Sequence, residues 1–232
     1  MNLPENIFKA YDIRGIYDQE LTNESVRLIA IALCDIYKEH NDPIVIGRDG
    51  RLSSETLSST LIQSFLDNGK SVIDVGQVPT PLLYFAVNYF SLNSGIIITG
   101  SHNPKNYNGL KIIMDGHALA GEEIQEIYNR IKSNNFKKNN IKTNASLENI
   151  KIDNFYIDAL LKDIKIAKKL KVAIDAGNGA AGPIALEAYK KTGLDIIDLY
   201  CNVDGDFPNH HPNPSDPRNL QDLISCVKEN KC

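Results

Sequence analysis

Hydrophobic and polar positions follow two different periods along the chain. After Thr22, a candidate N-cap, apolar residues spaced three and four apart predict a helix over 23–36. Similar spacing predicts helices over 57–67, 81–88 and 124–131, with Asn68-Gly69 ending the second and Pro81 in the first turn of the third. Short apolar runs predict buried strands at 44–46, 72–75, 95–99 and 110–114. This repeated alternation of strand and helix predicts an α/β fold.

A second unit follows a stretch rich in Asn and Lys over 133–146, which predicts a linker. Beyond it we predict a helix over 155–164, strands at Lys171–Asp175 and Asp195–Leu199, a helix opening at Pro183 and a helix over 217–230. We therefore divide the chain into a first domain, 1–146, and a second domain, 147–232. A βαβ pattern expects another strand after the last helix, so we expect the second domain to be truncated.

Composition limits the class of protein. The 232 residues are 42% apolar and 23% charged, which is ordinary for a soluble globular protein. The formal charge is −4, which gives no general reason to bind nucleic acid or an anionic membrane. No apolar run approaches the roughly 18 residues of a membrane span, and the opening residues do not resemble a signal peptide. The four cysteines form no C-x-x-C pair, so we expect reduced thiols and a cytoplasmic protein.

The segment 99–111, T-G-S-H-N-P-K-N-Y-N-G-L-K, carries the candidate chemistry. A buried strand leads into it, which is where open α/β sheets place their sites. A serine that accepts a phosphoryl group needs exposure, a group that manages the hydroxyl proton, and cations that hold the anion. Ser101, His102 and Lys111 could supply these three requirements. For a serine alone in a loop, the simpler interpretation is a polar turn.

This segment resembles the active-serine loop of the α-D-phosphohexomutases, the phosphoglucomutase and phosphomannomutase family, whose usual pattern is T-A/G-S-H-N-P, a short spacer, N-G and a lysine. Four further segments resemble motifs of that family in the same order. They are F-K-A-Y-D-I-R-G at 8–15, G-R-D-G-R-L-S at 47–53, D-A-G-N-G at 175–179 and D-F-P-N-H-H-P at 206–212. The resemblance covers nearly the whole chain and implies a three-layer αβα sandwich with a mixed sheet, followed by a truncated αβα domain.

The resemblance also implies an enzyme that interconverts hexose 1-phosphate and hexose 6-phosphate of glucose or mannose. Ser101 would carry the phosphoryl group, and hexose 1,6-bisphosphate would be the intermediate and activator. Mg²⁺ would be bound by the phosphate on Ser101, with its other ligands in a D-G-D-G-D-R loop that would lie beyond Cys232. Because that loop and later elements of the family pattern are not in this sequence, we expect little mutase activity from this chain alone.

By the same resemblance, Arg14 and Lys111 are the cations expected beside the phosphate, and Arg48 is a further candidate. Lys111 or His102 would manage the proton of the sugar hydroxyl. Tyr11 would contact the substrate or serve as a hydrophobic staple at the domain edge. Each cation also has a structural interpretation: Arg14 could pair with Asp12 or Asp18, Arg48 and Arg51 could pair with Asp49, and Lys111 could be a solvated strand residue.

Three alternatives remain open at this point. The loop 177–182, G-N-G-A-A-G, matches a dinucleotide-binding pattern between strand and helix, with Asp198 placed for a ribose and Asp175 poorly placed for a pyrophosphate. Its glycines could instead allow close packing of helix and strand. A metal at Asp204, Asp206, His210 and His211 is disfavoured against a rigid surface turn. Finally, the chain could be a non-catalytic assembly fragment that pairs with a complementing C-terminal piece.

Overall fold

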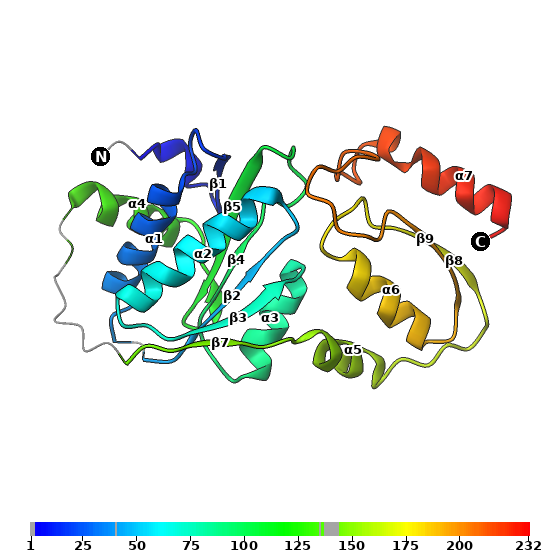
Figure 1. Cartoon of the computed structure of the whole chain (residues 1–232), viewed down its shortest axis with the longest axis horizontal. Helices are drawn as coiled ribbons and strands as arrows, with labels where there is room; N and C mark the ends of the chain where they lie inside the picture. Colours follow the sequence, from blue (N-terminus) through cyan, green and yellow to red (C-terminus); the bar gives the residue numbers. More distant parts are fainter. Residues whose placement is uncertain (1–2, 40, 135, 137–143) are drawn as a thin grey trace. The chain divides into compact units, whose positions relative to one another are not determined.

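The computed structural model describes residues 3–39, 41–134, 136 and 144–232 (Figure 1). The chain forms two compact units: unit 1 contains Met1–Ser101 and Asn106–Ile150, and unit 2 contains His102–Lys105 and Lys151–Cys232. Most of the predicted linker lies outside the described residues. Among the helices described, none is both long enough and apolar enough to cross a bilayer.

A mixed seven-stranded sheet forms the centre of unit 1 in the described part of the chain. Its strands run in the order β1-β5-β4-β2-β3-β7, with β6 paired to β5. Strands β4, β2, β3 and β7 are parallel to one another, and β5 is antiparallel to β1 and β4. Their bounds are β1 (Ile13–Ile16), β2 (Ile44–Arg48), β3 (Val72–Gln77), β4 (Gly95–Ile98), β5 (Tyr107–Met114), β6 (His117–Ala118) and β7 (Leu147–Asn149).

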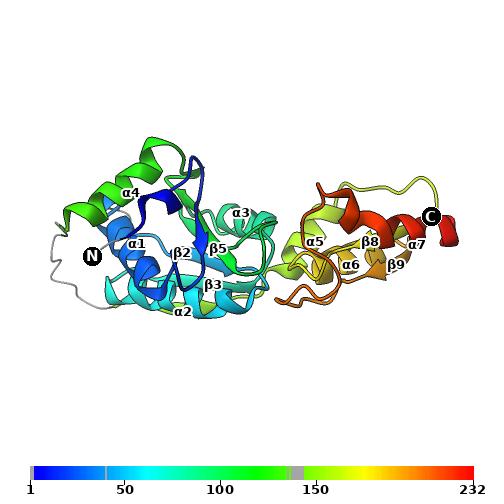
Figure 2. The same cartoon turned by 90° about the horizontal axis from the view of Figure 1, so that it is seen from above.

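Helices cover both faces of this sheet. Figures 1 and 2 show α1 and α2 on one face and α3 across the sheet from them. Successive side chains of each strand point to opposite faces of the sheet. Ile46 and Ile96 belong to the main core with α1 and α2, and the residues next to them in β2 and β4 point toward α3. The three-layer αβα sandwich with a mixed sheet is therefore confirmed. The helices are α1 (Asn23–Ile36), α2 (Leu52–Asp67), α3 (Thr80–Tyr89) and α4 (Glu122–Ser133), with a short 3₁₀ turn η1 (Glu5–Ile7) before β1.

Helix α1 begins where the sequence predicts. The Thr22 hydroxyl oxygen accepts a hydrogen bond from Ser25 N at 3.1 Å, and Thr22 N donates to the Ser25 hydroxyl at 3.2 Å. This reciprocal capping box satisfies backbone donors that the first turn of a helix leaves unpaired. The predicted N-cap is confirmed.

Unit 2 is a small α/β unit with two parallel strands in its described residues. Helix α6 packs on β9 and α7 packs on β8. The first helix ends at Leu161, before the predicted Ile164. The elements are α5 (Asp153–Leu161), β8 (Lys171–Asp175), α6 (Gly182–Lys191), β9 (Asp195–Leu199), η2 (Pro217–Leu220) and α7 (Gln221–Asn230).

Strand β7 lies just after the position where the sequence places the domain boundary. Leu147–Asn149 pairs with Val72, Ile73 and Asp74 of β3, so this strand extends the sheet of unit 1. The two compact units accordingly divide after Ile150.

Candidate active site

Ser101 lies at the carboxyl end of the central strand β4. Its side chain is exposed, whereas Thr99 and Gly100 just before it are buried. The Ser101 backbone has φ of 53°, in the left-handed region that residues other than glycine seldom adopt. Such conformations concentrate at functional sites, where the surrounding structure holds them in place.

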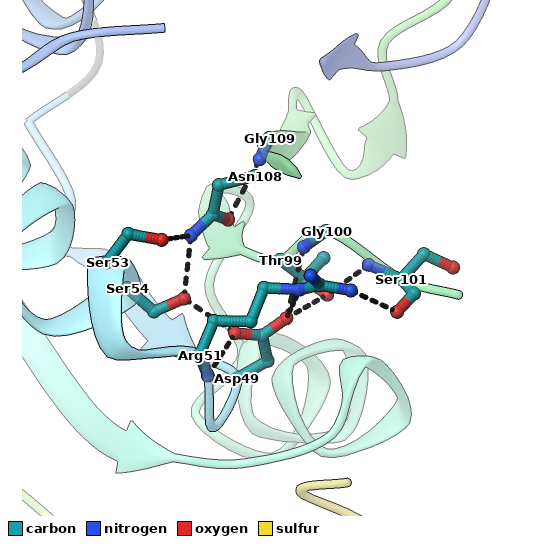
Figure 3. Close-up of polar contacts among 9 residues, drawn as sticks. All are labelled: Asp49, Arg51, Ser53, Ser54, Thr99, Gly100, Ser101, Asn108 and Gly109. Carbon is teal, nitrogen blue, oxygen red and sulfur yellow. Dashed lines mark hydrogen bonds and ion pairs between the residues drawn. The ribbon is translucent and has the colours of Figure 1, made fainter. Parts of the chain in front are cut away.

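The carboxylate of Asp49 organises the backbone around this serine (Figure 3). Asp49 directly follows β2, which is parallel to β4, so both strands deliver their ends to the same edge of the sheet. The Asp49 Oδ2 atom accepts hydrogen bonds from Thr99 Oγ1 at 2.9 Å and Gly100 N at 3.0 Å. The hydroxyl oxygen of Thr99 in turn accepts a bond from Ser101 N at 2.9 Å.

Arg51, the residue just before α2, belongs to the same hydrogen-bond network. Its side chain is almost wholly buried, and Nε donates to Asp49 Oδ2 at 3.2 Å while Nη2 donates to the Ser101 carbonyl at 2.9 Å. Burial lowers the pKa of Arg51, and the Asp49 carboxylate opposes that shift. Ser54 donates to Asp49 Oδ1 at 2.6 Å, and Asn108 donates to the Ser54 hydroxyl at 2.9 Å. Three stretches of the chain, 49–54, 99–101 and Asn108 on β5, thus meet around one ion pair.

A second cluster contains Asp12, Arg14 and Lys111 on the neighbouring strands β1 and β5. Asp12 is only 3% exposed, and its Oδ2 accepts from Arg14 Nη2 and lies 3.6 Å from Lys111 Nζ. Two cations share one carboxylate, so the cluster carries one net positive charge. The Arg14 Nε atom is buried and finds no hydrogen-bond partner among the residues that the structure describes, which is costly unless a ligand or solvent supplies one.

The register of the sheet brings the two clusters close to one another. Thr99 N donates to Gly109 O at 2.9 Å, and Gly109 pairs with Arg14 across β5 and β1. Neighbouring strands lie about 4.8 Å apart, so the backbone of Arg14 is about two strand spacings from that of Thr99. The positive charge of Arg14 also lowers the pKa of Arg51, after the larger effect of burial. Arg14 therefore lies near the loop that presents Ser101.

The sequence left two roles open for Tyr11, a hydrophobic staple and a substrate contact, and Phe8 provides the apolar contact instead. Phe8 is buried and packs against Tyr128, with ring centroids 5.3 Å apart, so Phe8 provides the apolar contact at this edge. Tyr11 is 66% exposed, and Lys111 Nζ lies 5.4 Å from the centre of its ring. An exposed ring that stacks on a cation of the site can still contact a ligand.

The remaining predicted residues are placed differently. His102 follows Ser101 directly and is exposed. Arg48 ends β2, and its carbonyl accepts a hydrogen bond from Val78 N at 2.8 Å. Within the described residues, no ion pair or hydrogen bond of the Arg48 guanidinium is found. Of the two arginines in G-R-D-G-R, it is Arg51 that pairs with Asp49 and contacts the serine.

Asp49, Arg51 and Thr99 are the residues that sequence reasoning left without a functional role. The only signal was the possible pairing of Asp49 with Arg48 or Arg51. Spacing cannot show which arginine turns inward, because the turn after β2 decides it. Arg51 N donates to Asp49 Oδ1 at 3.0 Å, and this local turn aims the guanidinium back over the carboxylate.

In unit 2, the backbone N–H groups of the G-N-G loop donate hydrogen bonds to neighbouring groups of the protein. Gly177 N donates to Asp175 Oδ1 at 2.8 Å, Asn178 N to Tyr200 O at 2.8 Å and Gly179 N to Ala176 O at 2.8 Å. These are the backbone donors that a dinucleotide pyrophosphate would need. The geometry thus counts against the dinucleotide interpretation. At Gly182, an added Cβ would lie 2.2 Å from Cys201 O, which supports close packing as the reason for a glycine there.

Side chains of the F-P-N-H-H-P segment form hydrogen bonds with this loop. His210 Nε2 lies 3.0 Å from both carboxylate oxygens of Asp175, and His210 Nδ1 lies 3.0 Å from His211 O. Burial opposes protonation of His210, but these hydrogen bonds outweigh it and raise its pKa. Asn209 Nδ2 donates to Asn178 Oδ1 at 2.8 Å. No group of three potential metal ligands is found among the described residues of the chain.

Comparison with known proteins gives matches along nearly the whole chain. The family model described as "Phosphoglucomutase/phosphomannomutase, alpha/beta/alpha domain I" matches residues 5–138, and its domain II counterpart matches residues 154–232. A phosphomannomutase/phosphoglucomutase of Pseudomonas putida is 46% identical over 98% of this chain and 48% of its own length. A phosphoglucomutase of Neisseria meningitidis is 44% identical over 98% of this chain and 49% of its own length.

Solved structures give the same result. A crystal structure of a phosphoglucomutase/phosphomannomutase family protein from Burkholderia thailandensis superposes with a TM-score of 0.90 at 39% identity, covering 98% of this chain and 51% of the other. A putative phosphomannomutase from Thermus thermophilus, at 23% identity and a TM-score of 0.80, shares the fold. The chain spans about half the length of the curated relatives it matches.

Proposed function

The chain belongs to the phosphoglucomutase/phosphomannomutase family, and we propose that Ser101 is its phosphoryl carrier. The observation that supports this most strongly is an exposed serine, held in a left-handed conformation at the end of β4, in a loop that matches the family's serine motif. The full reaction we propose interconverts hexose 1-phosphate and hexose 6-phosphate through a hexose 1,6-bisphosphate. The relatives whose names carry that activity are about twice as long.

In the proposed transfer, Ser101 is the protein group that forms a covalent bond with the phosphoryl group. The bond from Ser101 Oγ to phosphorus breaks while a sugar hydroxyl oxygen bonds to phosphorus. The proton of that hydroxyl passes to a basic side chain of the site, and Ser101 Oγ takes up a proton as it leaves. The transferring group spreads negative charge over its oxygens, so cations and positioning dominate catalysis. A second transfer returns the other phosphate of the bisphosphate to Ser101.

We assign charge stabilisation to Arg14 and Lys111. Together with Asp12 they carry one net positive charge, and Arg14 Nε is a buried donor in need of an acceptor. A phosphate oxygen would satisfy that donor. Either Lys111, which lies 3.6 Å from Asp12 Oδ2 and 5.4 Å from the centre of the Tyr11 ring, or His102, which directly follows Ser101, would accept the sugar proton. Arg48 stays a proposed substrate contact.

The Mg²⁺ that family resemblance implies would take oxygen ligands. A phosphate on Ser101 could supply one of them. The carboxylates described beside this loop, Asp12 and Asp49, already accept bonds from arginine and other donors. The residues that the structure describes therefore do not form a complete magnesium site.

The experiment that tests the proposal is intact-mass analysis of the chain before and after incubation with glucose 1,6-bisphosphate. We expect one added phosphate, localised to Ser101 by fragmentation and lost in Ser101→Ala. Ser91→Ala is a matched control, because Ser91 is also exposed with φ of 55° but lies outside the serine motif. Phosphate on another residue, or none on a folded chain, would reject the proposal.

The complementing-fragment hypothesis concerns the complete reaction. We expect little turnover of glucose 1-phosphate to glucose 6-phosphate by these 232 residues, and turnover when a C-terminal half of a relative is added. Full turnover by the chain alone would contradict this expectation.

A further inference from the structure

Both backbone polar groups of Ser101 are held by the ion pair of Asp49 and the buried Arg51, the carbonyl directly and the N–H through Thr99. The carbonyl accepts from Arg51 Nη2 at 2.9 Å. The N–H donates to Thr99 Oγ1, which donates to Asp49 Oδ2. A left-handed residue relaxes to an extended conformation unless such contacts fix it on both sides. The Asp49–Arg51 pair thus determines where the peptide groups on either side of the serine point.

The same pair is unsuited to binding the phosphate itself. Asp49 and Arg51 neutralise each other, and the Arg51 side chain is only 1% exposed. Its Nε and Nη2 atoms already donate to Asp49 and to the Ser101 carbonyl. Figure 3 shows the Ser101 hydroxyl pointing away from the guanidinium. The pair therefore acts on the backbone of the serine and leaves its hydroxyl to other partners.

The pair is also braced from α2 and β5. Ser54 Oγ donates to Asp49 Oδ1, and Asn108, which is fully buried, donates to the hydroxyls of Ser53 and Ser54. A polar network in which each member is satisfied is rigid. Rigidity of this kind is what a nucleophile needs, because a misplacement of about 1 Å can cost about a hundredfold in rate.

We infer that Asp49 and Arg51 are positioning residues, which hold Ser101 in its left-handed conformation so that its hydroxyl meets the phosphoryl group in line. The inference rests on the proposed function of Ser101. It separates two kinds of cation in this site: Arg51 aims the serine, whereas Arg14 and Lys111 face the transferred charge.

Two substitutions test the inference on the full chain. Arg51→Lys keeps the charge but loses the planar fork that reaches both Asp49 and Ser101. Thr99→Val keeps the shape but removes the hydroxyl that links Asp49 to Ser101 N, and Thr99→Ser restores that hydroxyl. Arg130→Lys is the matched control, since Arg130 pairs with the buried Asp35 in the same unit but between α1 and α4.

The assay follows phosphate loading of Ser101 from glucose 1,6-bisphosphate by intact mass, over a range of donor concentrations, with thermal midpoints measured alongside. For Arg51→Lys and Thr99→Val we expect the maximal loading rate to fall about a hundredfold, with a half-saturating concentration within about twofold of the original chain. Thr99→Ser should load at nearly the original rate. Arg130→Lys should lower the thermal midpoint and leave the loading rate unchanged.

Loading at the original rate in Arg51→Lys, or equal losses in Thr99→Val and Thr99→Ser, would overturn the inference. If the unsubstituted chain takes no phosphate, the proposed function fails, and a crystal structure of Arg51→Lys then decides the positioning claim separately. We expect Ser101 to leave the left-handed region in that variant. Retention of the same φ would refute the positioning role.

Discussion

Adding one methyl group at Gly109 is expected to separate β1 from β5 and to displace Arg14 from the serine. A Cβ on Gly109 would lie 2.3 Å from Ile13 O and 3.4 Å from Arg14 Cα. Ordinary contact begins near 3.4 Å, so the two strands would have to move about 1 Å apart. Strand β1 is at the edge of the sheet and is the one free to move.

The cost of Gly109→Ala combines overpacking with weakened strand pairing. Overpacking of a well-packed site costs about 1–3 kcal/mol, and a strained backbone hydrogen bond adds about 1 kcal/mol. We therefore expect a loss of about 3 kcal/mol, which corresponds to a fall in thermal midpoint of roughly 6–12 °C for a unit of this size. Because Arg14 moves with β1, loading of Ser101 with phosphate should fall about a hundredfold.

Circular dichroism melting and intact-mass loading measure the two effects on the same sample. Gly116→Ala is the control: its φ of 76° disfavours alanine, but its nearest contact is an ordinary 3.6 Å from Asn93 Oδ1, and it lies at the opposite end of β5. That variant should be destabilised by about 1–2 kcal/mol and should load normally. A Gly109→Ala variant with the original midpoint and loading rate would refute the reasoning from strand spacing.

Three further predictions concern stability and reactivity. Thr22→Ala removes the capping box of α1 and should cost about 1 kcal/mol in a denaturant titration of unit 1; no change would show that the cap is dispensable. The pKa of His210 is raised in the folded chain, so its contribution to stability should be complete below its unfolded pKa and lost as pH rises through the folded value. Denaturation of unit 2 should therefore need more urea at about pH 6 than at about pH 8, and His210→Gln should remove the difference. Burial raises the pKa of Cys34 to about 12, so Cys34 should react with a thiol reagent only after unfolding, whereas the more accessible Cys232 should react first.

The elements that the sequence predicts well are those whose pattern depends on burial alone. The run at 95–99 is buried on both faces in a central strand, so its uninterrupted apolar character identifies it as a strand. Helix α1 is equally clear, because its apolar spacing and its capping residue agree. By contrast, β1 holds Arg14 and Gly15 and is a strand only because β5 provides a partner. Pairing with a strand so distant in sequence leaves no periodic pattern of apolar residues in β1 itself.

The candidate site divides in the same way. Ser101, Arg14 and Lys111 could be proposed from the sequence because they lie in motifs that resemble those of the family. The network beneath the serine could not, because Asp49 and Thr99 are 50 residues apart and meet only when β2 and β4 align in parallel. The sequence favoured Arg48 over Arg51 as a site residue, and the structure shows that the Arg51 guanidinium donates to the Ser101 carbonyl. Sequence patterns thus indicated the groups that we propose face a ligand, while the network of Asp49, Arg51 and Thr99 beneath the serine required the structure.

The central claim is that a phosphate on Ser101 is held by neighbouring cations, and ³¹P NMR titration of the phosphorylated chain tests it most directly. An exposed phosphoserine has a second pKa near 6. The two cations that we propose hold it, Arg14 and Lys111, would favour the dianion. We therefore predict a pKa at least about one unit lower, rising toward the exposed value in Arg14→Gln and Lys111→Gln. A phosphate on Ser101 whose second pKa is near 6 and does not change in either variant would contradict the account.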